Sequence, residues 1–271
     1  MIRTILRDIW TSRELFAQLT KRDLKLRYRQ AIMGFAWALF IPVLTISAGL
    51  ILRMVFVSAG NAGAPSLGGI AIKSWAWAFF AGAMNFATIS LLSNASLVTK
   101  IYFPREVLPL ASIVAQGVDS LIGLAVLIIV GPWLGFHWSL ALSWVPLLML
   151  SLLLLTTGLA LLFACANLFF RDVKYILQVL LTFGIFFTPV LFEPPAKYAK
   201  WMMLNPLSPI LEGLRLTVVE RTSLLVTIHS ASGTVTWSPW YLAYGVGVGI
   251  AVTLLGMIAF RKSAAYFAEY Y

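Results

Sequence analysis

Residues that could perform acid–base or metal chemistry are few in this sequence of 271 residues, and they are scattered. The chain has ten carboxylates, two histidines and one cysteine. His137 and His229 lie far apart, and neither belongs to a metal-ligand spacing. The sequence contains no G-x-x-x-x-G-K-[ST] loop, which excludes a nucleotide site of the P-loop kind. We therefore predict no catalytic residue, no metal site and no cofactor on this chain.

One carboxylate, Asp119, falls deep inside a long apolar stretch at residues 107–131. An ionisable group at such a position is costly and often belongs to an ion or proton pathway. A secondary transporter that relays protons or sodium usually buries more ionisable groups than this one. Asp119 is therefore either a functional intramembrane residue or one that pairs with a neighbouring helix or a polar cavity.

A charged stretch, TKIYFPREVLPL at residues 99–110, separates two apolar runs and is more elaborate than a polar turn. Pro104 disfavours helical backbone at Phe103, so a short structured element is expected to end there. The alternative is a capped turn shaped only by the topology of the chain. The residues that give this stretch its character are Lys100, Tyr102, Phe103, Pro104, Arg105 and Glu106, and what they contact has to be argued from the rest of the chain.

Composition assigns the chain to the membrane proteins. Hydrophobic residues make up 61% and charged residues only 11%, whereas a soluble domain carries about 25% charged residues. The net charge is +10, and eight of the 20 basic residues fall in the first 29 positions, which is typical of a basic segment beside anionic lipid headgroups. Nucleic acid is the less favoured explanation of this charge.

Six apolar segments are long enough to cross a bilayer as helices. They lie at residues 32–57, 74–93, 107–131, 140–169, 176–192 and 241–260. Most basic residues fall on the side of the two termini, so both termini are predicted to be cytoplasmic. The fold class is an all-α integral membrane protein with six transmembrane helices.

The remaining residues form segments at the two membrane surfaces. Residues 1–31 are a cytoplasmic N-terminal segment with an amphipathic interface helix from Ser12 to about Gln30, and 261–271 are a cytoplasmic tail. Between them, residues 32–260 form the transmembrane domain, with a cytoplasmic loop at 94–106 and an outer loop at 193–238. Short re-entrant or interfacial helices are expected in the outer loop, one of them starting at Asn205 and Pro206.

Aromatic residues gather in three of the predicted spans. They form either an aromatic belt at the membrane surface or the lining of a channel on which sugar rings can stack. Both interpretations stay open from the sequence. The residues concerned are Trp37, Phe40, Trp75, Trp77, Phe183 and Phe187.

Five sequence stretches resemble one family of transport proteins. They are RDLKLRYRQAIMGFAWALFIPVL at 22–44, TKIYFPREVLPL at 99–110, NLFFRDVKYIL at 167–177, FFTPVLFEP at 186–194 and LNPLSPILEGLR at 204–215. With these in order, the chain resembles the membrane-spanning subunit of type-2 ABC exporters. The branch is the one that exports polysaccharides or polyol phosphates such as O-antigen, capsule or teichoic acid.

The resemblance implies a permease subunit in the bacterial cytoplasmic (inner) membrane. It would work as a homodimer, with two copies of an ABC ATPase subunit that binds ATP and magnesium. Its substrate would be a lipid-linked glycan, and membrane lipids would surround it. The loop at 94–106 would carry a coupling helix that docks on the ATPase, with Tyr102 and Phe103 as its apolar plug. Lys100, Arg105 and Glu106 would orient this helix, and Pro104 would end it. The other candidate ATPase contacts are Arg22, Lys25, Arg171 and Asp172, the last two being alternatively a local ion pair.

Two other classes of function remain. A related exporter of drugs or small lipids would share the six spans but would need no long polymer channel. An integral membrane glycosyl-transfer enzyme would need converging acids or metal ligands in its loops, and the scattered carboxylates disfavour it. A membrane scaffold without transport function would not explain the charged loop at 94–106.

Overall fold

The structure, a computed structural model, describes residues 11–28, 44, 47–51, 53–55, 66–100, 103–195, 197–229 and 235–264. Its secondary structure is almost entirely helical. The elements are α2 (Arg13–Tyr28), α4 (Leu67–Ser93), α5 (Ala95–Lys100), α6 (Val107–Val130), η1 (Gly131–Leu134), η2 (Leu140–Trp144), α7 (Val145–Phe169), α8 (Val173–Phe187), α9 (Ala199–Met202), α10 (Leu207–Val218), β1 (Ile228–His229), β2 (Val235–Trp237) and α11 (Pro239–Ala264).

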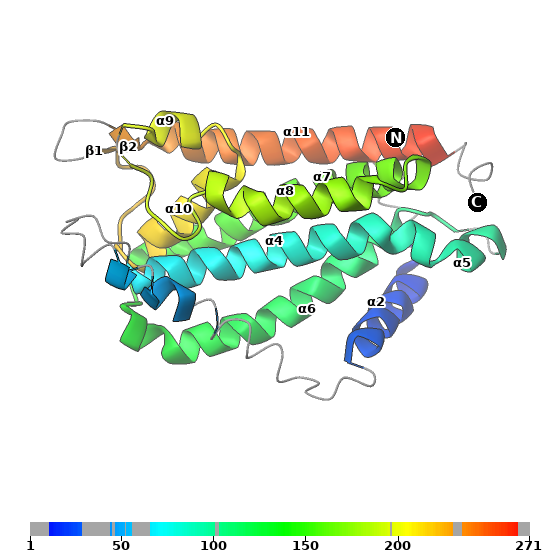
Figure 1. Cartoon of the computed structure of the whole chain (residues 1–271), viewed down its shortest axis with the longest axis horizontal. Helices are drawn as coiled ribbons and strands as arrows, with labels where there is room; N and C mark the ends of the chain where they lie inside the picture. Colours follow the sequence, from blue (N-terminus) through cyan, green and yellow to red (C-terminus); the bar gives the residue numbers. More distant parts are fainter. Residues whose placement is uncertain are drawn as a thin grey trace.

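Five long helices, α4, α6, α7, α8 and α11, run along the same axis and form an elongated bundle (Figure 1). We call one end of the bundle the α5 end, because it carries α5, α2 and the turn from α7 to α8. The opposite end, the α10 end, carries α9, α10, η1, η2 and the short hairpin of β1 and β2 (Figure 1). These two ends correspond to the predicted cytoplasmic and outer sides.

Four helices are long and apolar enough to cross a membrane: Leu67–Ser93, Val107–Leu134, Leu140–Phe169 and Pro239–Ser263. They coincide with four of the six predicted spans. The predicted span at 176–192 is a shorter helix, Val173–Phe187. It ends because Pro189 disfavours helical backbone at Thr188, which is extended at φ −111° and ψ 136°. The predicted span at 32–57 lies largely outside the described residues.

Helix α4 begins seven residues earlier than the sequence pattern predicts. The Oγ of Ser66 accepts a hydrogen bond from the backbone N–H of Gly69 at 3.2 Å and so caps the helix. The added turns carry Lys73 into the helix, although the sequence placed it outside the span. Its side chain is fully buried.

The interior contains two groups of buried apolar side chains. The larger one lies between α4, α7 and α10 and includes Phe79, Leu152 and Trp237. The smaller one, at the α5 end, joins Leu19 of α2 to Phe260 of α11. Helices α7 and α11 approach closely at Gly158. A Cβ built on this glycine would stand only 2.4 Å from the carbonyl carbon of Val252.

The loop between α8 and α11 departs from the prediction in two ways. It contains a small antiparallel hairpin, in which Ile228 pairs with Trp237, so the all-α assignment was incomplete. The helix expected after Asn205 is present as α10, and Asn205 Oδ1 accepts from the Leu207 N–H at 3.1 Å. However, every residue of α10 is buried, whereas a helix lying at the membrane surface would keep one polar face in water.

Candidate functional site

Helix α2 is held against α6 by a polar network. Arg27 Nη1 lies 2.5 Å from Asp119 Oδ2 and 2.7 Å from Gln116 Oε1, and its guanidinium stacks 3.6 Å above the ring centroid of Phe86. Asp23 Oδ2 accepts a hydrogen bond from Ser112 Oγ one turn away. Of the two roles predicted for Asp119, pairing with a neighbouring helix is therefore the one observed.

The same helix contacts the start of the loop at 94–106. Arg22 Nη2 donates to Asn94 Oδ1 at 2.6 Å and to Asp23 Oδ1 at 3.0 Å. Asn94 is also the C-cap residue of α4. Arg22 therefore connects α2 to the junction between α4 and α5, while Lys25, one turn further along, is exposed to solvent.

The loop at 94–106 forms a short helix, α5, followed by a turn into α6. Phe103 is buried among the apolar side chains of the α5 end, and buried Glu106 lies 3.5 Å from Arg261 Nε. These two side chains point into the protein, so the prediction that places them on a docking surface is wrong for this conformation. The predicted apolar plug thus loses Phe103, which instead fixes the loop to the bundle.

The other predicted residues of this loop fall into two sets. Phe103 and Pro104 are both outside helix, and α5 ends at Lys100. The Pro104 carbonyl accepts from the Val107 N–H at 3.1 Å in the turn that starts α6. Arg105 is half-buried, and its carbonyl accepts from the Leu108 N–H. Tyr102 and the side chain of Lys100 lie outside the described residues.

The turn from α7 to α8 exposes a second group of charges at the α5 end. Arg171, Asp172 and Lys174 are all exposed, and the structure shows no ion pair between Arg171 and Asp172 within its described ranges. Asn167 fixes the turn, because its Nδ2 donates to the Thr88 carbonyl and its Oδ1 accepts from the Lys174 N–H. The alternative of a local Arg171–Asp172 pair is therefore not observed.

The predicted aromatic residues lie in different environments. Trp75 is buried and its Nε1 donates to the Ser120 carbonyl at 2.8 Å, so it joins α4 to α6. Trp77 is half-buried between α4 and α8, close to Gly184. Phe183 and Phe187 are 57% and 76% exposed. Trp37 and Phe40 lie outside the described residues.

Helix α8 leaves a complete apolar face uncovered by the parts of the chain that the structure describes. The exposed residues recur at helical spacing, so they share one face, while Leu177 on the opposite face is buried. A continuous apolar stripe of this kind is typical of a surface that meets lipid or another helix. Its residues are Tyr175, Ile176, Val179, Leu180, Phe183, Phe186 and Phe187.

A buried ion-pair cluster at the α10 end was not predicted. Arg215 donates to Glu212 Oε1 through Nε at 2.8 Å and Nη2 at 2.5 Å. It also pairs with Glu193 at 3.4 Å and with Glu220. Lys73 Nζ lies 3.7 Å from Glu212 Oε2 and donates to the Phe192 carbonyl at 2.6 Å. The cluster therefore ties α4, α10 and the segment after α8 together.

Electrostatics keep Arg215 charged. Burial alone would lower the pKa of Arg215, but the neighbouring carboxylates, Glu212 first among them, outweigh burial and raise that pKa above its ordinary value. A cation whose pKa is raised by folding contributes stability at every pH below its ordinary value. The contribution of Arg215 is therefore expected to persist throughout the alkaline range in which proteins are handled.

The signal for this cluster was partly present in the sequence. Glu212 and Arg215 are three residues apart on a predicted helix, a spacing that lets their side chains meet. Lys73 carried no such signal, because its partners lie far from it in the sequence. Among the residues that the structure describes, no group of three or more His, Cys, Asp or Glu could hold a metal ion.

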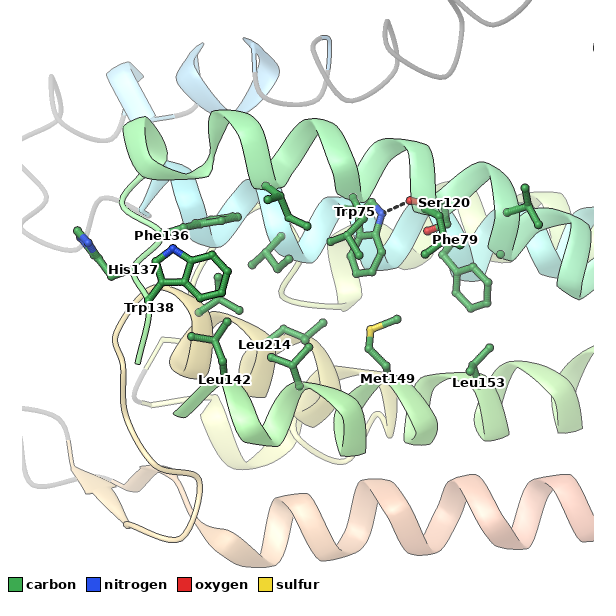
Figure 2. A pocket seen from close by; sticks show the side chains of 18 of the residues that line it. Trp75, Phe79, Ser120, Phe136, His137, Trp138, Leu142, Met149, Leu153 and Leu214 are labelled. Atoms are coloured by element: carbon green, nitrogen blue, oxygen red, sulfur yellow. Dashed lines mark hydrogen bonds between the residues drawn. The ribbon is translucent and has the colours of Figure 1, made fainter. Parts of the chain in front are cut away.

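An apolar cavity of about 700 Å³ lies between α6 and α7, towards the α10 end. Figure 2 shows its walls, with Trp75 and Phe79 of α4 on one side and Met149 and Leu153 of α7 on another. Phe136, His137 and Trp138 stand at its α10 end (Figure 2). No sequence pattern predicts this cavity, because it depends on the separation of two helices.

Comparison with known proteins gives consistent results along the chain. A family profile described as ABC-2 type transporter matches residues 14–219. Two proteins of Klebsiella pneumoniae named O-antigen export system permease protein RfbA are 26% and 25% identical over 261 residues, which is 94% of this chain and 94% of each relative. A protein of the same name from Myxococcus xanthus is 28% identical over 214 residues, or 76% of this chain and 80% of the relative.

Proposed function

This chain belongs to the ABC-2 type transporter family, and we propose that it is the permease subunit of an exporter of lipid-linked polysaccharide. The substrate would be of the O-antigen, capsule or teichoic-acid type, crossing the bacterial cytoplasmic (inner) membrane. The names of its relatives support this substrate class. The match covers 94% of this chain and 94% of the relative, so the two proteins share nearly their whole length. This shared length supports assigning the same substrate class to both.

The observation that carries the proposal is the uncovered aromatic face of α8. Phe183, Phe186 and Phe187 stand exposed on a helix whose other face packs on α4 and α7. In a homodimer, two such faces would border one path through the membrane. Flat aromatic rings would let sugar rings slide past, since contact between apolar ring faces involves no directional hydrogen bond.

ATP hydrolysis would occur on a separate ABC ATPase subunit, present in two copies with ATP and magnesium. The α5 end is proposed as its docking side and as the cytoplasmic side, with both termini there. The exposed charges of Lys25, Arg171 and Asp172 are the contacts best placed for it. Phe103, Glu106 and Arg22 would transmit the movement, because they anchor the loop at 94–106 to α2 and the bundle.

Deletion of the gene in its native cell tests the transport proposal. We expect loss of the surface glycan and accumulation of its lipid-linked form inside the cell, both restored by the intact chain. Surface glycan would be measured on whole cells with a lectin or antibody, and the intracellular form in lipid extracts. Unchanged surface glycan with reduced efflux of a drug or small lipid would contradict the proposal and favour the other exporter class.

Charge reversal at the α5 end tests the docking side separately. Lys25→Glu and Arg171→Glu are expected to reduce co-purification of the ATPase and surface glycan together, because both bases are exposed there. Lys200→Glu is the matched control, since Lys200 is exposed at the α10 end. Equal loss in the control, with all variants folded, would show that docking does not depend on this end.

A further inference from the structure

We propose that the cavity between α6 and α7 is a binding site for one acyl chain of a membrane glycerophospholipid. The cavity is lined almost entirely by hydrocarbon from four elements: Val114 and Leu121 of α6, Met149 and Leu153 of α7, Phe79 of α4 and Leu214 of α10. A cavity of about 700 Å³ lies within the range of roughly 300–1,000 Å³ usual for small-molecule sites. This proposal is independent of the transported substrate.

The level of the membrane surface near this cavity is given by exposed tryptophans. Trp133, Trp138, Trp201 and Trp240 lie at the α10 end, and each is at least 75% exposed. Exposed indole rings at one level of an apolar bundle are typical of a membrane–water interface. Trp138 is one of these four exposed tryptophans and also lines the end of the cavity. The cavity therefore starts at the interface and extends towards the bilayer centre.

The length of the cavity matches one leaflet. Its lining on α7 extends from Val145 to Leu153 and on α6 from Ile113 to Ile128, which at ~1.5 Å per residue is about 12 Å and about 22 Å. One half of a hydrocarbon core of ~30 Å is ~15 Å, between these two values. An acyl chain that spans one leaflet fits this depth, whereas a long polyprenyl chain would exceed it.

The open side of the cavity gives access from the lipid. Val114, Val118, Leu121 and Ile128 line it and are also exposed on the surface of α6, so a chain can enter sideways without crossing a polar layer. Trp75 forms part of the wall without an unmet polar group, because its Nε1–H already donates to the Ser120 carbonyl (Figure 2). His137 lies at the end where the headgroup would stand, with ring nitrogens able to contact a phosphodiester.

Photolabelling of the full-length chain in phospholipid nanodiscs tests this site. The nanodiscs would contain a phosphatidylglycerol that carries a diazirine within its acyl chain. After transfer to detergent with few lipids retained, the sample is irradiated and the adducts are located by mass spectrometry. We expect adducts at Met149 or Leu153 to persist, while adducts at Leu255, an exposed residue of α11, disappear with the bulk lipid.

A glycine in the cavity wall offers a matched pair of variants. A Cβ at Gly117 would meet only a Phe79 ring carbon, at 4.0 Å, so Gly117→Leu fills the cavity without a clash at its base. Since leucine displaces several methylene groups, each of which adds to affinity, we expect retained labelling to fall about tenfold or more. Gly247→Leu on α11, where no heavy atom lies within 4 Å, should leave it unchanged.

Three results would overturn the proposal. The first is loss of the Met149 and Leu255 adducts in parallel, which would indicate ordinary surrounding lipid. The second is equal retention in Gly117→Leu and in the native chain, with both eluting as folded protein. The third comes from a photoreactive amino acid in place of Leu121: protein adducts instead of lipid adducts would mean that another segment or a second copy fills the cavity. Should Gly117→Leu fail to fold, Met149→Trp fills the same space from α7.

Discussion

Arg215 is the side chain on which the most charges converge at the α10 end, and its partners differ in burial. Glu212 is 5% exposed at its side chain, whereas Glu220 is 41% exposed. Removing one partner of a buried pair leaves an uncompensated charge without water around it. An exposed partner is replaced by water at little cost. The two glutamates therefore provide an internal comparison with the same arginine.

Glu212→Gln is predicted to destabilise the protein far more than Glu220→Gln. For Glu212 the loss is expected to be about 3–5 kcal/mol, because Lys73 and Arg215 both lose their buried counter-charge. For Glu220 it is expected to be about 0.2–1 kcal/mol. Thermal unfolding of the purified variants in one detergent measures the difference. Equal midpoints would mean that the cluster is open to water and contributes nothing specific.

Some of these residue contacts were accessible from the sequence and others were not. The intramembrane position of Asp119 left two roles open, a functional residue or a paired one, and Arg27 of α2 pairs with it. The inward direction of Phe103 and Glu106 was not predictable, because sequence spacing around Pro104 does not determine which way a short turn faces. Lys73 was misplaced for a different reason. A span predicted from hydropathy ends where a lysine occurs, but inside the protein the Lys73 ammonium pairs with Glu212 and donates to the Phe192 carbonyl.

At the scale of elements, helices α7 and α11 approach one another closely. Gly158 and Gly256 face one another there, and a Cβ on Gly256 would stand 2.5 Å from the Gly158 carbonyl oxygen. Because no hydrophobic force drives helices together within lipid, membrane helices gain stability from the close packing that small residues allow. The pair of helices is therefore expected to depend on both glycines.

Gly158→Ala is predicted to destabilise the bundle, although alanine normally favours a helix. The new methyl group would overlap the backbone of Val252 and Thr253, which cannot rotate away, and overpacking of this kind costs about 1–3 kcal/mol. Gly247→Ala on the same helix pair is the control, because open space surrounds it. The measurement is the fraction of monodisperse protein after graded heating. A Gly158→Ala chain as resistant as the control would contradict the observed spacing.

Element boundaries were predicted less well than element existence, and caps explain the errors. Four predicted spans recur as long helices, because runs of apolar residues are sufficient to define them. The start of α4 was missed, since Ser66 caps a stretch that contains glycines and a lysine. The end of α8 was missed, although Pro189 was visible and its effect on Thr188 could have been anticipated.

At the scale of the whole molecule, one face of the bundle stands out. Helix α8 exposes a stripe of aromatic and aliphatic residues in the described single chain, and its contacts with α4 and α7 occupy only its other side. Lipid can cover such a face, and so can the same face of a second copy. The proposed homodimer requires the second arrangement, which makes the two alternatives separable by experiment.

Cysteines on α8 are predicted to cross-link two copies of the chain only from this face. With Cys165→Ala removing the native thiol, Ile176→Cys and Phe183→Cys should give dimers with a short bismaleimide in native membranes, because both positions are exposed. Leu177→Cys is the control, since Leu177 is buried on the opposite side of the same helix. Because two α8 helices must separate to open the proposed path, the cross-link should also stop glycan export. A Phe183→Cys chain that reacts with a monofunctional maleimide yet never cross-links would mean that α8 faces lipid, and the path would have to lie elsewhere.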